Sequence, residues 1–217
     1  MTRNTSNKLL SVYKILRKTY GPQGWWPART PFEVIVGAIL TQNTAWTNVE
    51  KAILNLKKNR ALSPRKIEKI GERTLARLIR PAGYYNIKAR RLKNFISFLY
   101  SGYGGSVKML SSEEPARLKE ILLSVNGIGP ETCDSIMLYA LNKPVFVVDA
   151  YTRRIFSRHS HFASSAGYHD IQKYFMDNLP KNIKLYNEYH ALIVRLAKDF
   201  CRTKPNCKNC PLYTDAV

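Results

Sequence analysis

The fold is decided by the stretch LKEILLSVNGIGPETCDSIMLYALNKPVFVVDAYTRRIFSR, which spans residues 118–158. Its apolar residues have helical spacing over 118–124, and the sequence VNGIG at 125–129 ends that helix. Pro130 suits the first position of a second helix, because its missing N–H would have no hydrogen-bond partner there anyway. Asn142-Lys143-Pro144 then ends the second helix. The stretch therefore predicts two helices joined by a tight hairpin.

The hairpin has the chemistry of a phosphate-binding site. Gly127 and Gly129 can adopt backbone angles that are closed to other residues. A tight turn in front of a helix also directs free backbone N–H groups, and the positive end of the helix dipole, towards an external ligand. The local pattern alone is equally compatible with glycines that serve only the turn.

A carboxylate follows the hairpin unit. The apolar run Val145–Val148 ends at Asp149, and a basic helix, Ala150–Arg158, begins directly after it. Aspartate is a favoured N-cap residue, so Asp149 is predicted to cap this helix. A carboxylate that accepts helix N–H bonds tends to stay ionised, as a catalytic base or a stabiliser of a cation must. Capping and catalysis are therefore compatible roles for Asp149.

The overall composition favours a polyanionic partner. The chain of 217 residues has 35 Lys and Arg against 15 Asp and Glu, a net charge of +20. Neutralising phosphates releases counterions, so we expect a nucleic-acid partner, although ribosome-type or non-specific binding would explain the charge equally well. No run approaches the ~20 apolar residues of a membrane span, and the N-terminus lacks the apolar core of a signal peptide. We expect a cytoplasmic, nucleoid-associated protein with no membrane partner and, without a coiled-coil heptad run, a monomer.

The stretch resembles the helix-hairpin-helix DNA glycosylases of the endonuclease III superfamily. The resemblance rests on the hairpin, the second helix, the apolar run and the aspartate, in that order. The resemblance implies that the partner is double-stranded DNA containing damaged bases, that Asp149 is catalytic and that Gly127, Ile128 and Gly129 bind DNA. The chain differs from the family pattern at Asn126, where proline is common, although turns also tolerate asparagine.

The same resemblance bears on whether the enzyme cuts the DNA strand. Relatives that do so carry a lysine at the position that Glu131 occupies here. A carboxylate cannot form a Schiff base with the opened sugar. The resemblance therefore implies a monofunctional glycosylase, which hydrolyses the N-glycosidic bond and leaves an abasic site.

Two segments before the hairpin extend the resemblance to DNA contacts. The run Ile39–Thr44 resembles the family segment in which a glutamine fills the gap left by an extruded base, which implies DNA contacts by Gln42 and Asn43. Extrusion is needed because a glycosylase cannot reach the sugar–base bond inside a stacked duplex. The segment around Lys88 also matches the family and implies a phosphate contact; the alternative is the solvated start of a basic helix.

Aromatic residues indicate the class of base. Trp-Trp-Pro upstream and a tryptophan just after Gln-Asn-Thr are similar to the 3-methyladenine branch of the superfamily. Alkylated purines are cationic, and an aromatic face attracts a cation by ~0.5–2 kcal/mol. For the adjacent tryptophans, packing into the core is the alternative. The resemblance implies a base pocket of Trp25, Trp26, Pro27, Trp46 and Glu131.

The C-terminal cysteines suggest a metal centre. Clustered cysteines in a basic cytosolic protein favour a metal over disulfides. Cys201, Cys207 and Cys210 resemble the iron–sulfur loop of many endonuclease III relatives, although the usual fourth cysteine is Ala216 here. The resemblance implies a [4Fe–4S] cluster whose fourth ligand is Asp215, solvent or a cysteine that the given sequence lacks. No metal at all, or zinc, remains an alternative. A cluster would hold Lys204 and Lys208 towards phosphates.

No segment alternates with a period of two, so the fold class expected is all-α. The resemblance implies the two-lobed helix-hairpin-helix glycosylase fold with a C-terminal cysteine loop, and a DNA cleft between the lobes. We expect one lobe at residues 30–141 and the other at residues 1–29 and 142–217. The function expected is removal of alkylated (3-methyladenine or 7-methylguanine type) bases. Alternatives are a glycosylase for oxidised pyrimidines or mismatched thymine or uracil, and a DNA-binding protein without chemistry.

Overall fold

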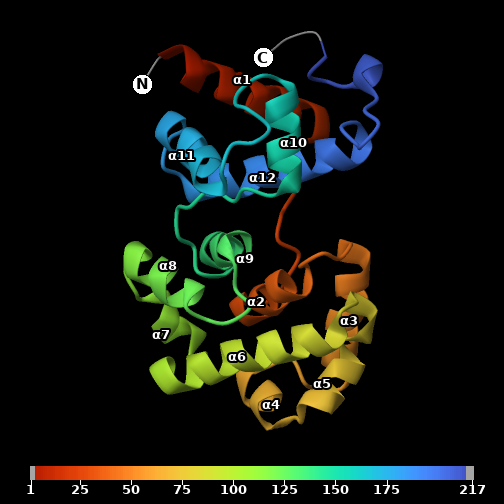
Figure 1. Cartoon of the computed structure of the whole chain (residues 1–217), viewed down its shortest axis with the longest axis vertical. Helices are drawn as coiled ribbons and strands as arrows, with labels where there is room; N and C mark the ends of the chain where they lie inside the picture. Colours follow the sequence, from red (N-terminus) through yellow and green to blue (C-terminus); the bar gives the residue numbers. More distant parts are fainter. Residues whose placement is uncertain (1–2, 214–217) are drawn as a thin grey trace. The chain divides into compact units, whose positions relative to one another are not determined.

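The computed structural model describes residues 3–213, and every regular element in that range is helical. The chain forms two compact units, one of residues 28–143 and one of residues 1–27 and 144–217 (Figure 1). The all-α fold class expected from the sequence is confirmed. None of the helices described is both long and apolar enough to cross a membrane.

The unit of residues 28–143 is built around two helices that differ in character. Helix α2 has apolar residues on all sides and is buried along nearly its whole length, as expected of a central helix. Helix α6 is the long helix of this unit, with α4 and α5 packed on one side and α2 on the other (Figure 1). The elements are α2 (Pro31–Leu40), α3 (Trp46–Lys58), α4 (Pro64–Lys69), α5 (Glu72–Leu78), η1 (Arg80–Ala82), α6 (Tyr85–Tyr103), α7 (Val107–Ser111), α8 (Pro115–Leu123), α9 (Pro130–Ser135) and η2 (Ile136–Ala140).

The second helix of the hairpin differs from the sequence prediction. The α-helical part, α9, ends at Ser135, and η2 continues the chain as a π-helix. Its wider turn is visible in the hydrogen bond from the N–H of Leu141 to the carbonyl of Ile136, 3.1 Å long. The apolar residues of this segment suit either geometry, so the sequence has no local signal for the change. The π segment lies where the chain packs against α2.

The other unit contains five helical elements in its described residues. Helix α1 packs against α11 and α12, and α10 packs against α12 (Figure 1). These elements are α1 (Arg3–Tyr20), α10 (Ala150–Arg158), α11 (Tyr168–Asn178), α12 (Ile183–Asp199) and η3 (Cys207–Asn209).

Aromatic side chains form the core of this second unit and fix the segment that leads to Asp149. Phe146 is fully buried and stacks on Phe175, with ring centroids 4.2 Å apart and an interplanar angle of 4°. Such aromatic pairs contribute about 0.5–1.5 kcal/mol beyond the area they bury. The amide of Gln172 donates to the Phe146 carbonyl at 2.7 Å. The extended run Val145–Val148 is therefore held from both its side chains and its backbone.

Candidate active site and DNA-binding elements

Asp149 lies at the start of α10 and caps it. One carboxylate oxygen, Oδ1, accepts hydrogen bonds from the backbone N–H of Thr152 at 2.7 Å and from its hydroxyl at 2.9 Å. Cap geometry needs an extended backbone at the capping residue, and Asp149 has φ −111° and ψ −179°. The predicted cap is thus present, and it leaves the second oxygen, Oδ2, for another partner.

That partner is His190 on α12, a residue that the sequence analysis did not single out. Its Nε2 lies 3.4 Å from Oδ2 of Asp149, and the two side chains are only 9% and 11% exposed. Burial by itself raises the pKa of Asp149. The charge and hydrogen bond of His190, together with the two bonds from Thr152, outweigh burial and leave the pKa below its ordinary value. Asp149 is therefore ionised at neutral pH.

Trp25 and Trp26 lie near the end of residues 1–27, the first chain segment of the unit that also contains Asp149. The rings of Trp25 and Trp26 are 5.2 Å apart, tilted by 52°, and both are partly exposed. Pro27 is exposed. Trp46, at the start of α3, and Glu131, in the first turn of α9, belong to the other unit; Trp46 is partly exposed and Glu131 is exposed. Neither tryptophan of the pair is fully buried, which leaves aromatic surface for a ligand.

The glycine-specific backbone expected of the hairpin is present at Gly127 but not at Gly129. Gly127 has φ +97°, which favours glycine, whereas Gly129 is extended with φ −90° and ψ 176°. Ile128 is 5% exposed, and its N–H donates to the Val125 carbonyl at 3.0 Å. Ile128 thus anchors the turn in the core, while the peptide groups beside it remain at the surface.

Gln42 is tied to this hairpin, although the two motifs are far apart in the sequence. Its amide nitrogen donates to the carbonyl of Gly127 and to the hydroxyl of Thr132, each at 2.9 Å. Its amide oxygen accepts from the guanidinium of Arg91. Asn43 follows in the left-handed conformation, with φ +52°, and is exposed. The structure therefore places Gln42 at the centre of one network with Arg91 and the hairpin. The sequence analysis identified Gln42 and the hairpin but not Arg91.

Lys88 corrects one prediction. Its side chain is 1% exposed, and its ammonium donates to the Leu40 carbonyl, the Thr44 hydroxyl and the Ala82 carbonyl at 2.7–2.9 Å. Burial, with a smaller effect from Arg91, lowers its pKa to about 8. An ammonium that already bonds three oxygens inside the protein has no donor left for DNA, so the predicted phosphate contact is wrong. Lys88 instead fixes the loop after α2.

The three C-terminal cysteines do not form a metal site with the described residues. Cys201 is buried and accepts a hydrogen bond from Arg158 at its sulfur, 3.3 Å away, whereas Cys207 is exposed. Cys210 is partly buried, which raises its pKa. Within residues 3–213 no group of three metal-ligating side chains could hold an ion. The proposed fourth-ligand position, Asp215 or Ala216, lies outside the described residues, so the cluster stays a prediction.

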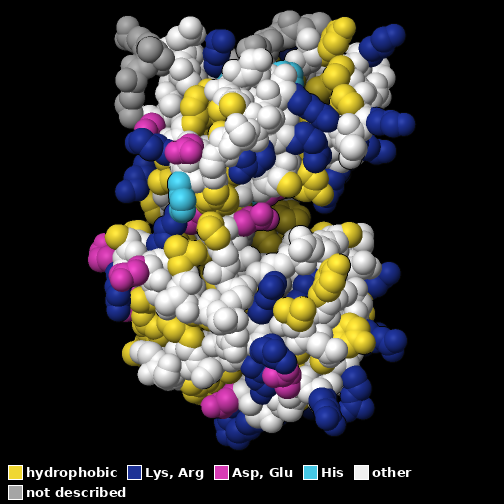
Figure 2. Space-filling model, viewed as in Figure 1, with side chains coloured by type: hydrophobic (Ala, Val, Ile, Leu, Met, Phe, Trp, Pro, Cys, Tyr) yellow, Lys and Arg dark blue, Asp and Glu magenta, His cyan; other side chains and the backbone are white. Residues whose placement is uncertain are grey.

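The loop that carries these cysteines is held by arginines of α10. Arg154 donates to the Cys201 carbonyl at 2.8 Å, and Arg158 donates to the carbonyls of Arg202 and Thr203 at 2.7 and 3.0 Å. Lys204 and Lys208 are exposed on this loop. On the face shown in Figure 2, basic side chains are spread over both units and acidic ones are fewer. Both units thus present positive charge to a polyanion.

Comparison with known proteins decides the family. The sequence pattern of the HhH-GPD superfamily base excision DNA repair proteins matches residues 36–181. The chain belongs to this superfamily. A provisionally named DNA repair glycosylase of Methanocaldococcus jannaschii is 51% identical over 213 residues, which cover 98% of this chain and 97% of the relative. This HhH-GPD protein is therefore a DNA N-glycosylase of base excision repair, which rules against the alternative of a DNA-binding protein without chemistry.

Solved structures similar to this HhH-GPD glycosylase come from two branches. The 3-methyladenine DNA glycosylase of H. pylori, bound to 1,N6-ethenoadenine, is 29% identical with a TM-score of 0.77, covering 88% of this chain and 97% of that one. Endonuclease III in a trapped covalent complex with DNA has a TM-score of 0.81 and covers 95% of this chain and 93% of that one. At 21% identity, the second likeness shows the fold alone.

Proposed function

We propose that this glycosylase excises alkylated purines by hydrolysis and does not cut the DNA strand. The observation that carries the proposal is Asp149, an ionised carboxylate that is 11% exposed and fixed by Thr152 and His190. A negative charge held rigidly in a largely buried place stabilises a developing cation more strongly than the same charge in water. Asp149 thus has the property needed to stabilise a sugar cation.

The reaction that we propose needs little acid catalysis. The bond between C1′ and the base nitrogen breaks, and its electron pair neutralises the positive charge of the alkylated base. The sugar becomes an oxocarbenium-like cation, which Asp149 stabilises while water adds to C1′ and loses a proton to the solvent. Since its pKa is lowered, Asp149 is a weak base, and we assign it electrostatic stabilisation and water orientation above proton abstraction.

The tryptophans support the choice of base. Trp25 and Trp26 present partly exposed aromatic faces, and a cationic purine gains ~0.5–2 kcal/mol on such a face. The similar H. pylori enzyme is named for 3-methyladenine. We infer that stacking on these aromatic faces selects the base more than hydrogen bonds do.

The residue at position 131 supports a monofunctional enzyme. Glu131 is exposed in the first turn of α9, where a carboxylate is favoured by the helix dipole. It cannot form the Schiff base through which a lyase cuts the strand. We propose that the product is an intact strand with an abasic site.

Base release from two duplexes tests the proposal. One duplex carries methylated purines and the other oxidised pyrimidines, and each is assayed with and without alkali for the wild type and for Asp149→Asn. Asparagine keeps the cap oxygen towards Thr152 but removes the charge, so we expect unchanged affinity for DNA and a turnover at least ~100-fold slower. Methylated purine should be released, with breaks only after alkali.

Other outcomes would contradict distinct parts of the proposal. Cleavage of the oxidised duplex without alkali would favour the endonuclease III-like alternative and would require a nucleophile other than residue 131. Unchanged turnover by Asp149→Asn would remove Asp149 from the reaction. Release of mismatched thymine or uracil in preference to methylated purine would refute the substrate class alone.

A further inference from the structure

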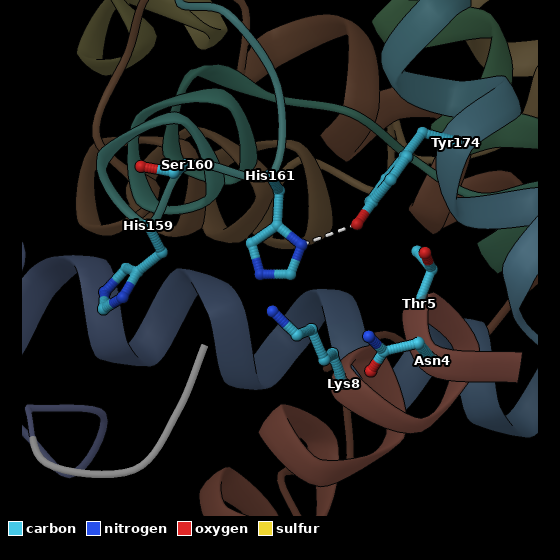
Figure 3. A pocket seen from close by; sticks show the side chains of 7 residues that line it. All are labelled: Asn4, Thr5, Lys8, His159, Ser160, His161 and Tyr174. Carbon is cyan, nitrogen blue, oxygen red and sulfur yellow. Dashed lines mark hydrogen bonds between the residues drawn. The ribbon is translucent and has the colours of Figure 1, made fainter. Parts of the chain in front are cut away.

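A pocket outside the groups assigned so far lies in the unit of residues 1–27 and 144–217. Its volume is about 340 Å³, and it lies where the first turns of α1, the loop after α10 and helix α11 meet (Figure 3). The side chains that matter here are two histidines and a lysine, His159, His161 and Lys8, and three hydroxyl groups, Thr5, Ser160 and Tyr174.

The pocket gathers basic groups without an acidic counterpart. Lys8 comes from α1 and the two histidines from the loop after α10, so the basic side chains come from separate segments (Figure 3). None of the described residues that line the pocket is a carboxylate. The pocket is unsuited to a metal cation. Lys8 would repel the cation, and residues 3–213 contain no group of three side chains that could hold a metal ion.

His161 has one ring nitrogen that is satisfied and one that is not. Its Nδ1 lies 2.6 Å from the hydroxyl of Tyr174. Burial raises the pKa of Tyr174, so this hydroxyl keeps its proton and can donate it to Nδ1. The ring hydrogen then resides on Nε2, which is buried and lacks a hydrogen-bond partner among the described residues. A buried donor of this kind is normally paired, and an anion in the pocket would supply the acceptor.

We propose that this pocket binds a phosphate group, either as a free phosphomonoester or at the end of a nucleic-acid strand. The tetrahedral arrangement of its oxygens suits donors from different directions, here Lys8 from α1 and, from the loop after α10, His159 and Nε2 of His161. The hydroxyl of Ser160, which also lines the pocket, adds a neutral donor. The volume exceeds that of a single phosphate and leaves room for water or for an attached sugar.

Binding should be coupled to protonation of His161. Burial, followed by the charges of His159 and Lys8, lowers the pKa of His161 to about 4. A bound dianion would offset both charges and favour the protonated ring, so affinity should rise as the pH falls. The titratable groups that face His161 are Lys8 from α1, His159 from its own loop and Tyr174 from α11.

The test uses the full chain and ring-nitrogen NMR of the histidines. Inorganic phosphate and sulfate are titrated at constant ionic strength; sulfate keeps its charge between pH 5 and pH 8, so its pH dependence reports only protein groups. We expect the pKa of His161 to rise on binding, and Lys8→Met and His161→Gln to weaken affinity about tenfold. His169→Ala alters an exposed histidine that does not line the pocket and should change nothing.

Two further oligonucleotides distinguish the sources of the phosphate. They are short single strands of the same sequence that end in a 5′-phosphate or a 5′-hydroxyl. A preference for the 5′-phosphate that Lys8→Met abolishes would support a strand end, and binding of inorganic phosphate alone would support a free ligand. The proposal is overturned if no anion perturbs His161, or if Lys8→Met, which changes an exposed residue and leaves the core intact, binds phosphate as the wild type does.

Discussion

Replacing Gly127 with alanine should destabilise the unit that carries the hairpin. The new methyl group would lie against the Cγ of Arg91 and only 2.9 Å from its Cδ, so the arginine side chain must move. That movement breaks the hydrogen bond from Arg91 to Gln42. In addition, the backbone at this position has φ +97°, which an L-residue with a side chain rarely adopts.

The expected loss of stability has two components, the strained backbone and the broken hydrogen bond. A non-glycine residue in a sparsely populated backbone region costs about 1–3 kcal/mol. A hydrogen bond to a charged group contributes about 1.5–3 kcal/mol, and we take the lower value because Arg91 is partly exposed. The sum is roughly 3 kcal/mol, which lowers the Tm of a chain of this length by about 6–12 °C.

Gly129→Ala is the matched control in the same hairpin. Gly129 has an extended backbone, and no atom lies within 4 Å of an added Cβ, so its Tm should stay the same or rise slightly. The methyl group would, however, stand in the open space where we propose that a DNA phosphate approaches. We expect Gly129→Ala to weaken binding to duplex DNA about tenfold, which corresponds to about 1.4 kcal/mol.

Thermal unfolding followed by circular dichroism, and fluorescence anisotropy with a labelled duplex, measure both variants. The reasoning is refuted if Gly127→Ala melts within about 1 °C of the wild type, because neither the contact with Arg91 nor the backbone angle would then constrain the hairpin. If Gly129→Ala binds DNA as the wild type does, the hairpin does not approach a phosphate closely.

Three shorter predictions follow. His190→Gln removes the charge beside Asp149, which raises the pKa of Asp149. As the pH is lowered, the variant should therefore lose single-turnover base release at a higher pH than the wild type does; an unchanged pH profile would contradict this. Lys88→Met should lower the free energy of unfolding by about 2–4 kcal/mol at pH 7, measured by urea unfolding. The pKa of Lys88 is about 8 in the folded chain and 10.5 unfolded, so the stability of the wild type relative to this variant should increase as the pH rises through that interval. Arg158→Ala should speed tryptic cleavage at Arg202 about tenfold, and an equal rate would show that Arg158 does not hold the loop.

The sequence was sufficient to predict those elements whose geometry depends only on residues close together in the chain. The turn at residues 125–129 followed by Pro130 predicted the hairpin, and the end of an apolar run at Asp149 predicted a capped helix. In both cases the steric and hydrogen-bonding demands involve residues within one helical turn of each other. Such demands can be inferred from the types of neighbouring residues.

Contacts between distant residues could not be read in this way. His190 is a single histidine on an amphipathic helix, and its approach to Asp149 depends on the packing of α10 against α12. Charge patterning places Lys88 at the start of a basic helix but does not reveal which side of that helix is buried. The π segment η2 also has no local signal, because its residues fit an α-helix equally well.

The enclosure of Lys88 also makes it a natural reporter of local opening. An amine-reactive reagent would label the exposed lysines of the native protein quickly but would reach Lys88 only when the loop after α2 separates from the Ala82 carbonyl. Because its amine loses a proton more readily than an ordinary lysine, it would react promptly once uncovered. The labelling rate at this one residue would therefore measure how often the segment that carries Gln42 detaches from the core, with and without DNA.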